Sequence, residues 1–220
     1  MNSFPGMLIV ILLPIVAIGI VAAIRYALRA GRGEALQKAA AGMKFTFQPQ
    51  ADPRLVDRLE HFHLFSQGRR KKITNVLQGR AGEIDVSIFD YRYVTGGGQH
   101  SRRWHQTVIS FESDAMRLPS FTLRPENLFH KIGQVFGYQD IDFDSHPEFS
   151  KRYLLKAENE SDVRHAFGTD VLSFYESDQK LSTEAAGRQL IHYRAAKRVP
   201  PNEIAEFIKR GVRVLTLFRK

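Results

Sequence analysis

The sequence predicts an α+β protein, with an N-terminal single transmembrane helix followed by a mainly antiparallel-sheet domain that carries several short helices. Two observations predict this architecture. Residues 7–24, MLIVILLPIVAIGIVAAI, form a continuous stretch without a charged side chain. From residue 44 onward, stretches that alternate apolar and polar residues follow one another, with helical stretches at intervals and without regular strand–helix alternation.

The apolar segment divides the chain into two parts. Residues 1–43 form the anchor and a juxtamembrane helix, and residues 44–220 form the α+β domain, with a possible subdivision near 145–150. A helix over 7–24 would be about 27 Å long, close to the hydrocarbon thickness of a bilayer. Basic residues flank only its C-terminal side, so the positive-inside rule places the N-terminus outside and the domain in the cytoplasm. A cleaved signal peptide is the alternative, but no Lys or Arg precedes the apolar segment.

The first half of the domain is rich in predicted strands. These lie at 44–48, 71–78, 83–94, 104–112 and 118–126. Asp52 and Pro53 occupy the N-cap and first-turn positions of a short helix after the first strand. The glycines at 79 and 82 then close a hairpin between the second and third strands.

The predicted strand at 83–94 has apolar residues on both faces. One face carries Ile84, Val86 and Ile88, and the other carries Phe89, Tyr91 and Tyr93. Either a bulge changes the apolar face near residue 88, or both faces of the strand are covered.

The second half of the domain mixes both kinds of element. We expect a helix at 125–137, a strand at 152–157, helices at 161–167 and 169–177, a hairpin at 180–194 and a helix opened by Pro200 and Pro201. The apolar segment VRVLTLF at 212–218 follows Gly211 and is expected to form a final strand.

Several kinds of chemistry are excluded by residues that the sequence lacks. It has no cysteine, which excludes disulfides, zinc–thiolate sites and thiol nucleophiles. It has no phosphate-binding Gly-rich loop, no Gly-x-Ser-x-Gly elbow and no His-Glu-x-x-His helix. The glycines at 96–98 lie between two predicted strands, which favours a hairpin tip. The sequence therefore predicts no catalytic residue and no cofactor.

The segment YQDIDFDSHPEF, from residue 138, is the one candidate metal site. Asp142, Asp144 and His146 are residue types that bind a divalent cation. A calcium loop starting at Asp140 is excluded, because Ser145 stands where glycine is needed and Lys151 where glutamate is needed.

A structural interpretation accounts for more of the same residues. Ile141 and Phe143 would face the core from a half-solvated strand, with the aspartates on its other face. Ser145 and Glu148 then have the spacing of a helix capping box.

The net charge of +9 favours anionic partners. The candidate residues for binding an anionic surface are Arg25, Arg29, Arg32, Arg69, Arg70, Lys71 and Lys72. A solvated hairpin is the simpler role for 69–72. Arg102 and Arg103 near the aromatic strand also raise single-stranded nucleic acid as a partner, although no RNA-binding motif supports it.

Three motifs carry a resemblance that covers most of the chain after residue 44. They are LRPE at 123–126, FHKIG at 129–133 and GYQDIDFDSHPEFSKRYLL at 137–155. With the apolar N-terminus, they resemble an uncharacterised family of bacterial membrane-anchored proteins. The resemblance implies a place in the bacterial inner membrane, and it brings no activity, cofactor or catalytic residue.

The function expected from these observations is non-catalytic. Residues 7–24 would anchor the chain in the bilayer. The basic cytoplasmic domain would bind a partner protein or the anionic membrane surface. The alternative is a metal-dependent hydrolase near the membrane that uses Asp142, Asp144 and His146. A third hypothesis is single-stranded nucleic-acid binding through basic and aromatic residues.

Overall fold

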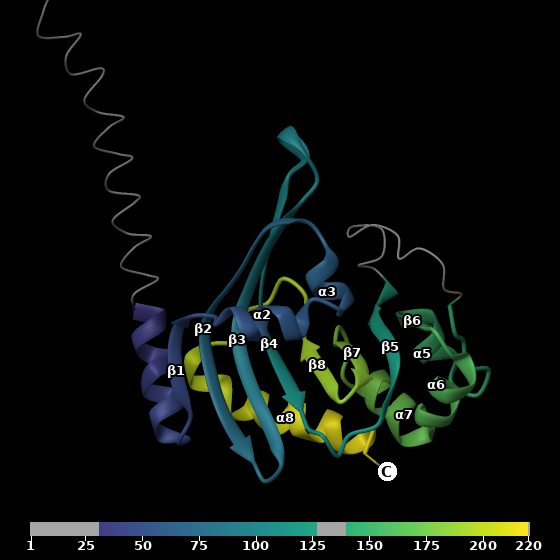
Figure 1. Ribbon diagram of the computed structural model, residues 1–220. Helices are drawn as coiled ribbons and strands as arrows, with labels where there is room; N and C mark the ends of the chain where they lie inside the picture. The colour runs from purple at the N-terminus through teal and green to yellow at the C-terminus, as the bar shows by residue number, and fades with distance from the viewer. Residues whose placement is uncertain (1–30, 127–139, 220) are drawn as a thin grey trace, which may run out of the picture.

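Eight strands form one sheet within residues 31–126 and 140–219, the parts of the chain that the computed structural model describes. The order is β1-β2-β3-β4-β8-β7-β5-β6, and every neighbouring pair is antiparallel (Figure 1). The strands are β1 (Thr46–Gln50), β2 (Arg69–Ala81), β3 (Ile84–Thr95), β4 (Arg102–Glu112), β5 (Leu118–Pro125), β6 (Tyr153–Ala157), β7 (Ser182–Gly187) and β8 (Gln189–Tyr193). The predicted α+β class with a mainly antiparallel sheet is confirmed. Strands from both sides of residues 145–150 belong to this sheet, so the sheet itself is not divided there.

Helices cover both faces of the sheet (Figure 1). Residues 31–42 are helical. The other helices are α2 (Pro53–Leu59), α3 (His63–Ser66), α5 (Pro147–Arg152), α6 (Glu160–Ala166), α7 (Thr169–Ser177) and α8 (Ile204–Leu217), with 3-10 turns η1 (Gly98–His100) and η3 (Pro201–Glu203). The short helix after β1 starts as predicted, because the Asp52 side chain accepts a hydrogen bond from Arg54 N at 2.8 Å and Pro53 begins the first turn.

The two faces of the sheet have separate hydrophobic cores. Val86 and Ile88 of β3 pack with helix 31–42 and α5 to α8. Phe89, Tyr91 and Tyr93 of the same strand pack with α2 and α3. The pairing of β3 with β4 is continuous, and its register shifts lie in the pairing with β2. Of the two alternatives for this strand, coverage of both faces is therefore the one observed.

The prediction of a final strand at 212–218 is wrong. Residues 204–217 form the continuous helix α8, which buries Ile204, Phe207, Gly211, Val214 and Leu215 on one side. This spacing is helical, but it is visible only if the helix is read through Gly211. A Cβ at Gly211 would lie 3.1 Å from atoms of Ile109 and Phe111. The glycine therefore allows α8 to approach β4 closely and does not end the helix.

Two predicted elements lie outside the described residues. They are the transmembrane helix at 7–24 and, beyond residue 126, the helix expected at 125–137. Of the helices in 31–126 and 140–219, none is long and apolar enough to span a bilayer.

Candidate anion-binding surface

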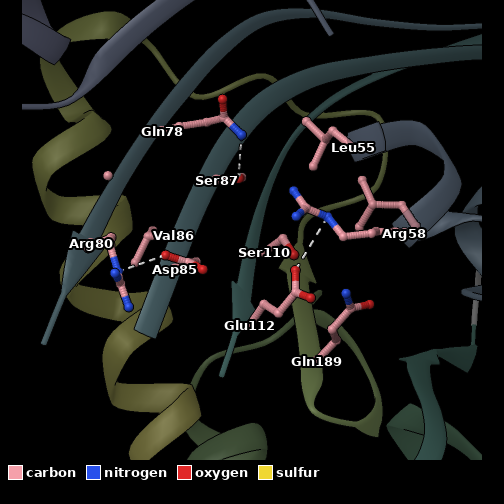
Figure 2. Close-up of a pocket in the computed structure, with 12 residues that line it drawn as sticks. Leu55, Arg58, Gln78, Arg80, Asp85, Val86, Ser87, Ser110, Glu112 and Gln189 are labelled. Atoms are coloured by element: carbon pink, nitrogen blue, oxygen red, sulfur yellow. Dashed lines mark hydrogen bonds and ion pairs between the residues drawn. The ribbon is translucent and has the colours of Figure 1, made fainter. Parts of the chain in front are cut away.

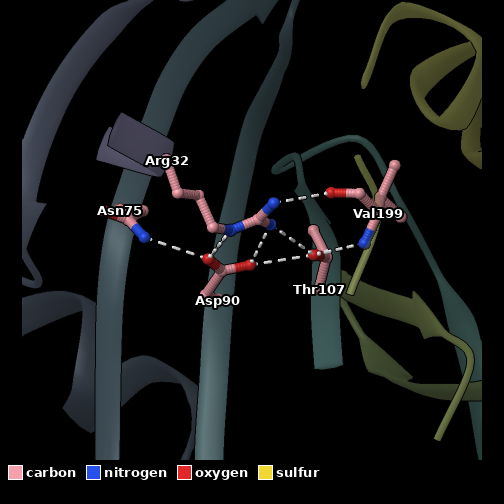
Figure 3. A network of polar contacts seen from close by, with 5 residues as sticks. All are labelled: Arg32, Asn75, Asp90, Thr107 and Val199. Carbon is pink, nitrogen blue, oxygen red and sulfur yellow. Dashed lines mark hydrogen bonds and ion pairs between the residues drawn. The ribbon is translucent and has the colours of Figure 1, made fainter. Parts of the chain in front are cut away.

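Arg32, near the start of helix 31–42, forms a buried ion pair with Asp90 of β3 (Figure 3). Its Nε and Nη2 atoms donate to the two oxygens of Asp90 at 2.7 and 2.8 Å. Nη1 donates to the Val199 carbonyl at 3.0 Å. The side chains of Arg32 and Asp90 are only 13% and 8% exposed. The anionic-surface role expected of Arg32 is therefore corrected, because its charge is neutralised inside the fold.

The sequence of β2 and β4 completes this network. Asn75 lies at a register shift of β2, has a positive φ of 53° and donates to Asp90 Oδ2 at 3.0 Å. Asparagine tolerates this left-handed conformation better than most residues. Thr107 Oγ1 donates to Asp90 Oδ1 at 2.9 Å and accepts from Val199 N at the same distance. Helix 31–42, three strands and the segment before η3 are thus held together at one carboxylate.

This network fixes where the chain runs toward its N-terminus. Helix 31–42 begins beside Asp90 and runs toward β1, whose Thr46 pairs with Gln78. The start of helix 31–42 therefore lies toward the end of the sheet at which the β3–β4 hairpin extends to η1 (Figure 1). We call this the η1 end, and the opposite end, with the β2–β3 turn, the Gly82 end.

Basic side chains meet on the sheet just beyond Asp90, toward the η1 end. Lys72, Arg92 and His105 are directly paired across β2, β3 and β4, and Arg103 is two residues from His105 on the same face. Thr107 N donates to the Lys197 carbonyl at 3.1 Å, which brings the neighbouring Arg198 beside this row. We call Lys72, Arg92, Arg103, Arg198 and His105 the basic patch.

The electrostatics of His105 agree with this placement of the three arginines. Burial, followed by the charges of Arg198, Arg92 and Arg103, lowers the pKa of His105, and Asp90 opposes the effect. Among the described residues, none forms an ion pair with Lys72, Arg92, Arg103 or Arg198. The sequence analysis missed Arg92, His105 and Arg198 because strand register, and not proximity in sequence, brings them together.

The predicted basic cluster at 69–72 lies at the start of β2, near the same end. All of its side chains are exposed. Arg69 donates to the Gly96 carbonyl of the hairpin tip, and Lys72 belongs to the basic patch. The other two candidates, Arg25 and Arg29, lie outside the described residues.

The aromatic side chains proposed to stack on nucleic-acid bases are not available. Tyr91 and Tyr93 are 2% and 1% exposed beneath α2 and α3. Trp104 is fully buried, and Arg102 covers its ring at 4.1 Å. This contradicts the aromatic part of the nucleic-acid hypothesis, because stacking requires an open ring face.

The candidate metal residues point to solvent or to protein groups. Ile141 and Phe143 are buried and the aspartates exposed, as predicted, but 140–143 is not a strand. Asp140 instead accepts from Leu155 N at 3.0 Å and so fixes the segment beside β6. Among the described residues, no group of three or more His, Asp or Glu side chains is placed to hold a metal.

The predicted capping box is also wrong. The N-cap of α5 is His146 and not Ser145, with Pro147 in the first turn. Ser145 Oγ lies 3.0 Å from His146 Nδ1, and Glu148 pairs with Arg152 one turn later at 2.7 Å. The proline fixes the start of the helix one residue later than the Ser-x-x-Glu spacing suggests.

A polar pocket of about 300 Å³ lies between α2 and the Gly82 end of the sheet (Figure 2). Its charged groups are already paired: Arg58 with Glu112 at 3.4 Å and Arg80 with Asp85 at 3.0 Å. The residues that line the pocket include no histidine that could activate Ser87 or Ser110. The pocket therefore lacks both a free cation and an activated nucleophile.

A buried cluster of ionisable side chains lies beneath α3, and the sequence analysis missed it. Glu184 of β7 accepts from Tyr193 at 2.9 Å and from Leu64 N at 3.2 Å, and burial raises its pKa. Burial and Arg124 lower the pKa of His63 to about 3, so the neutral ring accepts from Arg124 Nη1 at 2.7 Å. These contacts tie α3 to β5, β7 and β8. A single acid within the strand segment STEAAG was the available signal.

Comparison with known proteins supports the fold. No model of a known protein family matches the sequence, and no curated protein sequence matches it either. The crystal structure of the mycobacterial trehalose monomycolate transport factor A, TtfA, superposes with a TM-score of 0.64 at 15% identity. The match covers 86% of this chain and 95% of that one. At this identity the likeness shows a shared fold.

Proposed function

We propose that this chain is a non-catalytic, membrane-anchored protein whose domain rests its basic patch on the anionic surface of the bilayer. Residues 7–24 would anchor the chain in the bacterial inner membrane, with the domain on the cytoplasmic side. The convergence of Lys72, Arg92, Arg103 and Arg198 at the η1 end, without acidic partners in the described residues, carries the proposal.

The position of the patch relative to Gly31 supports this choice. The chain leaves the described domain at Gly31, beside the patch, and the expected anchor lies only a few residues earlier. A domain tethered there would meet the bilayer with its η1 end first. Each Lys or Arg near an anionic surface contributes about 1 kcal/mol, so several cations together orient the domain.

A solved structure that shares this fold adds a biological context to the proposal. TtfA is named as a transport factor for trehalose monomycolate. By analogy, we propose a supporting role at a lipid surface for the present chain.

The absence of cysteine makes a direct test possible. Ser101→Cys, exposed beside Arg102 and Arg103, would carry a fluorophore on the full chain in lipid nanodiscs. Lipids with a quencher on the headgroup should quench it more in discs containing phosphatidylglycerol than in discs of phosphatidylcholine alone. Equal quenching in both would overturn the proposal.

Two matched triple variants distinguish the effect of the basic patch from the effect of net charge. Replacing Arg92, Arg103 and Arg198 with Gln should abolish the extra quenching. Replacing Arg117, Arg188 and Arg219, which are exposed at the Gly82 end, removes the same charge and should leave it intact. Loss in both variants would show that net charge alone governs the contact.

A further inference from the structure

An apolar slot of about 360 Å³ opens between α2, α3 and the first part of β2. Val56 of α2, Phe65 of α3, Ile73 of β2 and the ring of Tyr91 form its walls. Beyond Thr74, β1 no longer pairs with β2, so within the described residues the slot lies at an edge of the sheet.

The walls of the slot are preformed. Phe65, Ile73 and Tyr91 are 7%, 7% and 2% exposed and belong to the same core, and the rings of Phe65 and Tyr91 are 4.6 Å apart. Val56 is 37% exposed, and among the described residues it is one of two large apolar side chains that are exposed. A chain of methylene groups entering here would cover Val56 without moving the core, at about 0.8 kcal/mol for each CH₂ buried.

The charged side chains beside the slot indicate which kind of head group the ligand has. Lys71, two residues before Ile73 on the same face of β2, lines the slot together with Glu60 and Ser66. In the described parts of the chain, Lys71 has no ion pair. Lys71 belongs to the basic run 69–72 at the η1 end, so the slot lies beside the surface proposed to meet the bilayer.

We propose that this slot binds one acyl chain of an anionic lipid, with the chain against Val56, Ile73 and Tyr91 and the head group at Lys71. The inference rests on the proposed function for the source of the lipid. It deepens that function, because the domain would then hold an individual lipid as well as lie on the surface. The volume is within the range of ligand pockets, which begins at about 300 Å³.

Trp104 provides a signal for binding, since it is the one tryptophan of the chain. Its ring stacks on Tyr93 at 5.9 Å, and Tyr93 stacks on Tyr91 at 5.4 Å. We would add cis-parinaric acid, a fluorescent fatty acid, to the full chain held in amphipol without added lipid. Energy transfer from Trp104 to the probe should saturate at one probe for each chain.

Competitors then define the ligand class. Decanoate should displace the probe, decanol should do so more weakly, and inorganic phosphate should not displace it. Displacement by phosphate alone would overturn the acyl-chain assignment. Equal displacement by decanol and decanoate would overturn the role of Lys71, and the variant Lys71→Gln should show that equality.

The chain offers a matched control for the slot. Val56→Glu places a charge in an apolar wall and should weaken probe binding by about tenfold. Val212→Glu makes the same change at a valine of α8 that is 42% exposed, and it should have no effect. Equal affinities of these two variants would overturn the proposal.

This measurement uses no bilayer, so it is independent of the nanodisc experiment. Loss of headgroup quenching with intact probe binding would reject the surface contact and keep the slot. The reverse result would reject the slot and keep the surface contact.

Discussion

The two ends of the sheet differ in whether their arginines have acidic partners. At the Gly82 end, Arg80 pairs with Asp85 and Arg188 with Asp114, and all four side chains are largely exposed. At the η1 end, Arg92, Arg103 and Arg198 surround His105, and none has an acidic partner among the described residues. The η1 end therefore has a group of cations that converge on one histidine without acidic partners in the described residues, in contrast to the pairs Arg80–Asp85 and Arg188–Asp114.

Arg32 shows what a paired cation does at the η1 end. Its partner Asp90 is buried, and the pair joins helix 31–42 to the middle of the sheet. This one ion pair therefore fixes the position of the helix. The neighbouring cations have no acidic partner in the described residues, so they are available to an external anion. The surface pairs at the Gly82 end have neither consequence, because exposed pairs contribute little to stability.

The largest effect should come from breaking the buried pair. Asp90→Ala leaves Arg32 buried without a counter-charge, and we expect it to lower the free energy of unfolding by about 3–5 kcal/mol. Asp85→Ala, which breaks the exposed pair with Arg80, should cost less than about 1 kcal/mol. Urea unfolding of the full chain in amphipol, followed by Trp104 fluorescence, measures both. Similar losses would remove the distinction between the two ends.

The second-largest effect should be that of salt, which should weaken the contact between the η1 end and the membrane. The Debye length falls from about 10 Å at 0.1 M salt to about 3 Å at 1 M. Quenching of the label at residue 101 in anionic nanodiscs should then fall to the level of neutral discs. The variant without Arg92, Arg103 and Arg198 should show no further decrease, and quenching that persists at high salt would indicate an apolar contact instead.

The two triple variants should also differ slightly in stability. Removing Arg117, Arg188 and Arg219 breaks the pair with Asp114, so we expect a loss of up to about 1 kcal/mol. Removing Arg92, Arg103 and Arg198 breaks no ion pair and relieves repulsion, so the midpoint of thermal unfolding should stay the same or rise. A lower midpoint for this second variant would show that these cations have partners in the native protein.

The smallest expected effect is on the titration of His105. Burial and the adjacent arginines lower its pKa, so the folded protein binds this proton less readily than the unfolded chain. Stability from neutral His105 is therefore complete above the unfolded pKa of about 6.5 and is lost as the pH falls below it.

Removing Arg92, Arg103 and Arg198 should raise the pKa of His105, measured from its imidazole resonances by NMR. Burial is the larger cause, so the pKa should remain below 6.5. The triple variant at the Gly82 end should leave it unchanged. A pKa that is the same in both variants would show that the cations do not converge on His105.

Sequence patterns predicted local elements well where the local signal was complete. Asp52 and Pro53 marked the start of α2 because an N-cap and a first-turn proline act within a few residues. The hairpin β2–β3 followed from glycines between two alternating segments. Local patterns failed at Gly211, where a glycine typical of a helix end instead allows α8 to approach β4.

The candidate site was predicted only in part. The run at 69–72 is contiguous, so composition revealed it, and it lies at the η1 end. Arg32 belonged to the same prediction, but nothing in its neighbourhood in the sequence indicated Asp90, which is 58 residues away. The aromatic residues of β3 led to the nucleic-acid hypothesis because the sequence does not show that α2 and α3 cover them.

By itself, the sequence determined the α+β class, the antiparallel strands and an excess of positive charge, because alternation, turns and composition are local properties. Only the tertiary structure decided where that charge acts. Strand register brings Lys72, Arg92 and His105 side by side, and the pairing of Arg32 with Asp90 removes one arginine from the surface. Such choices depend on contacts between residues far apart in the chain, which no local pattern encodes.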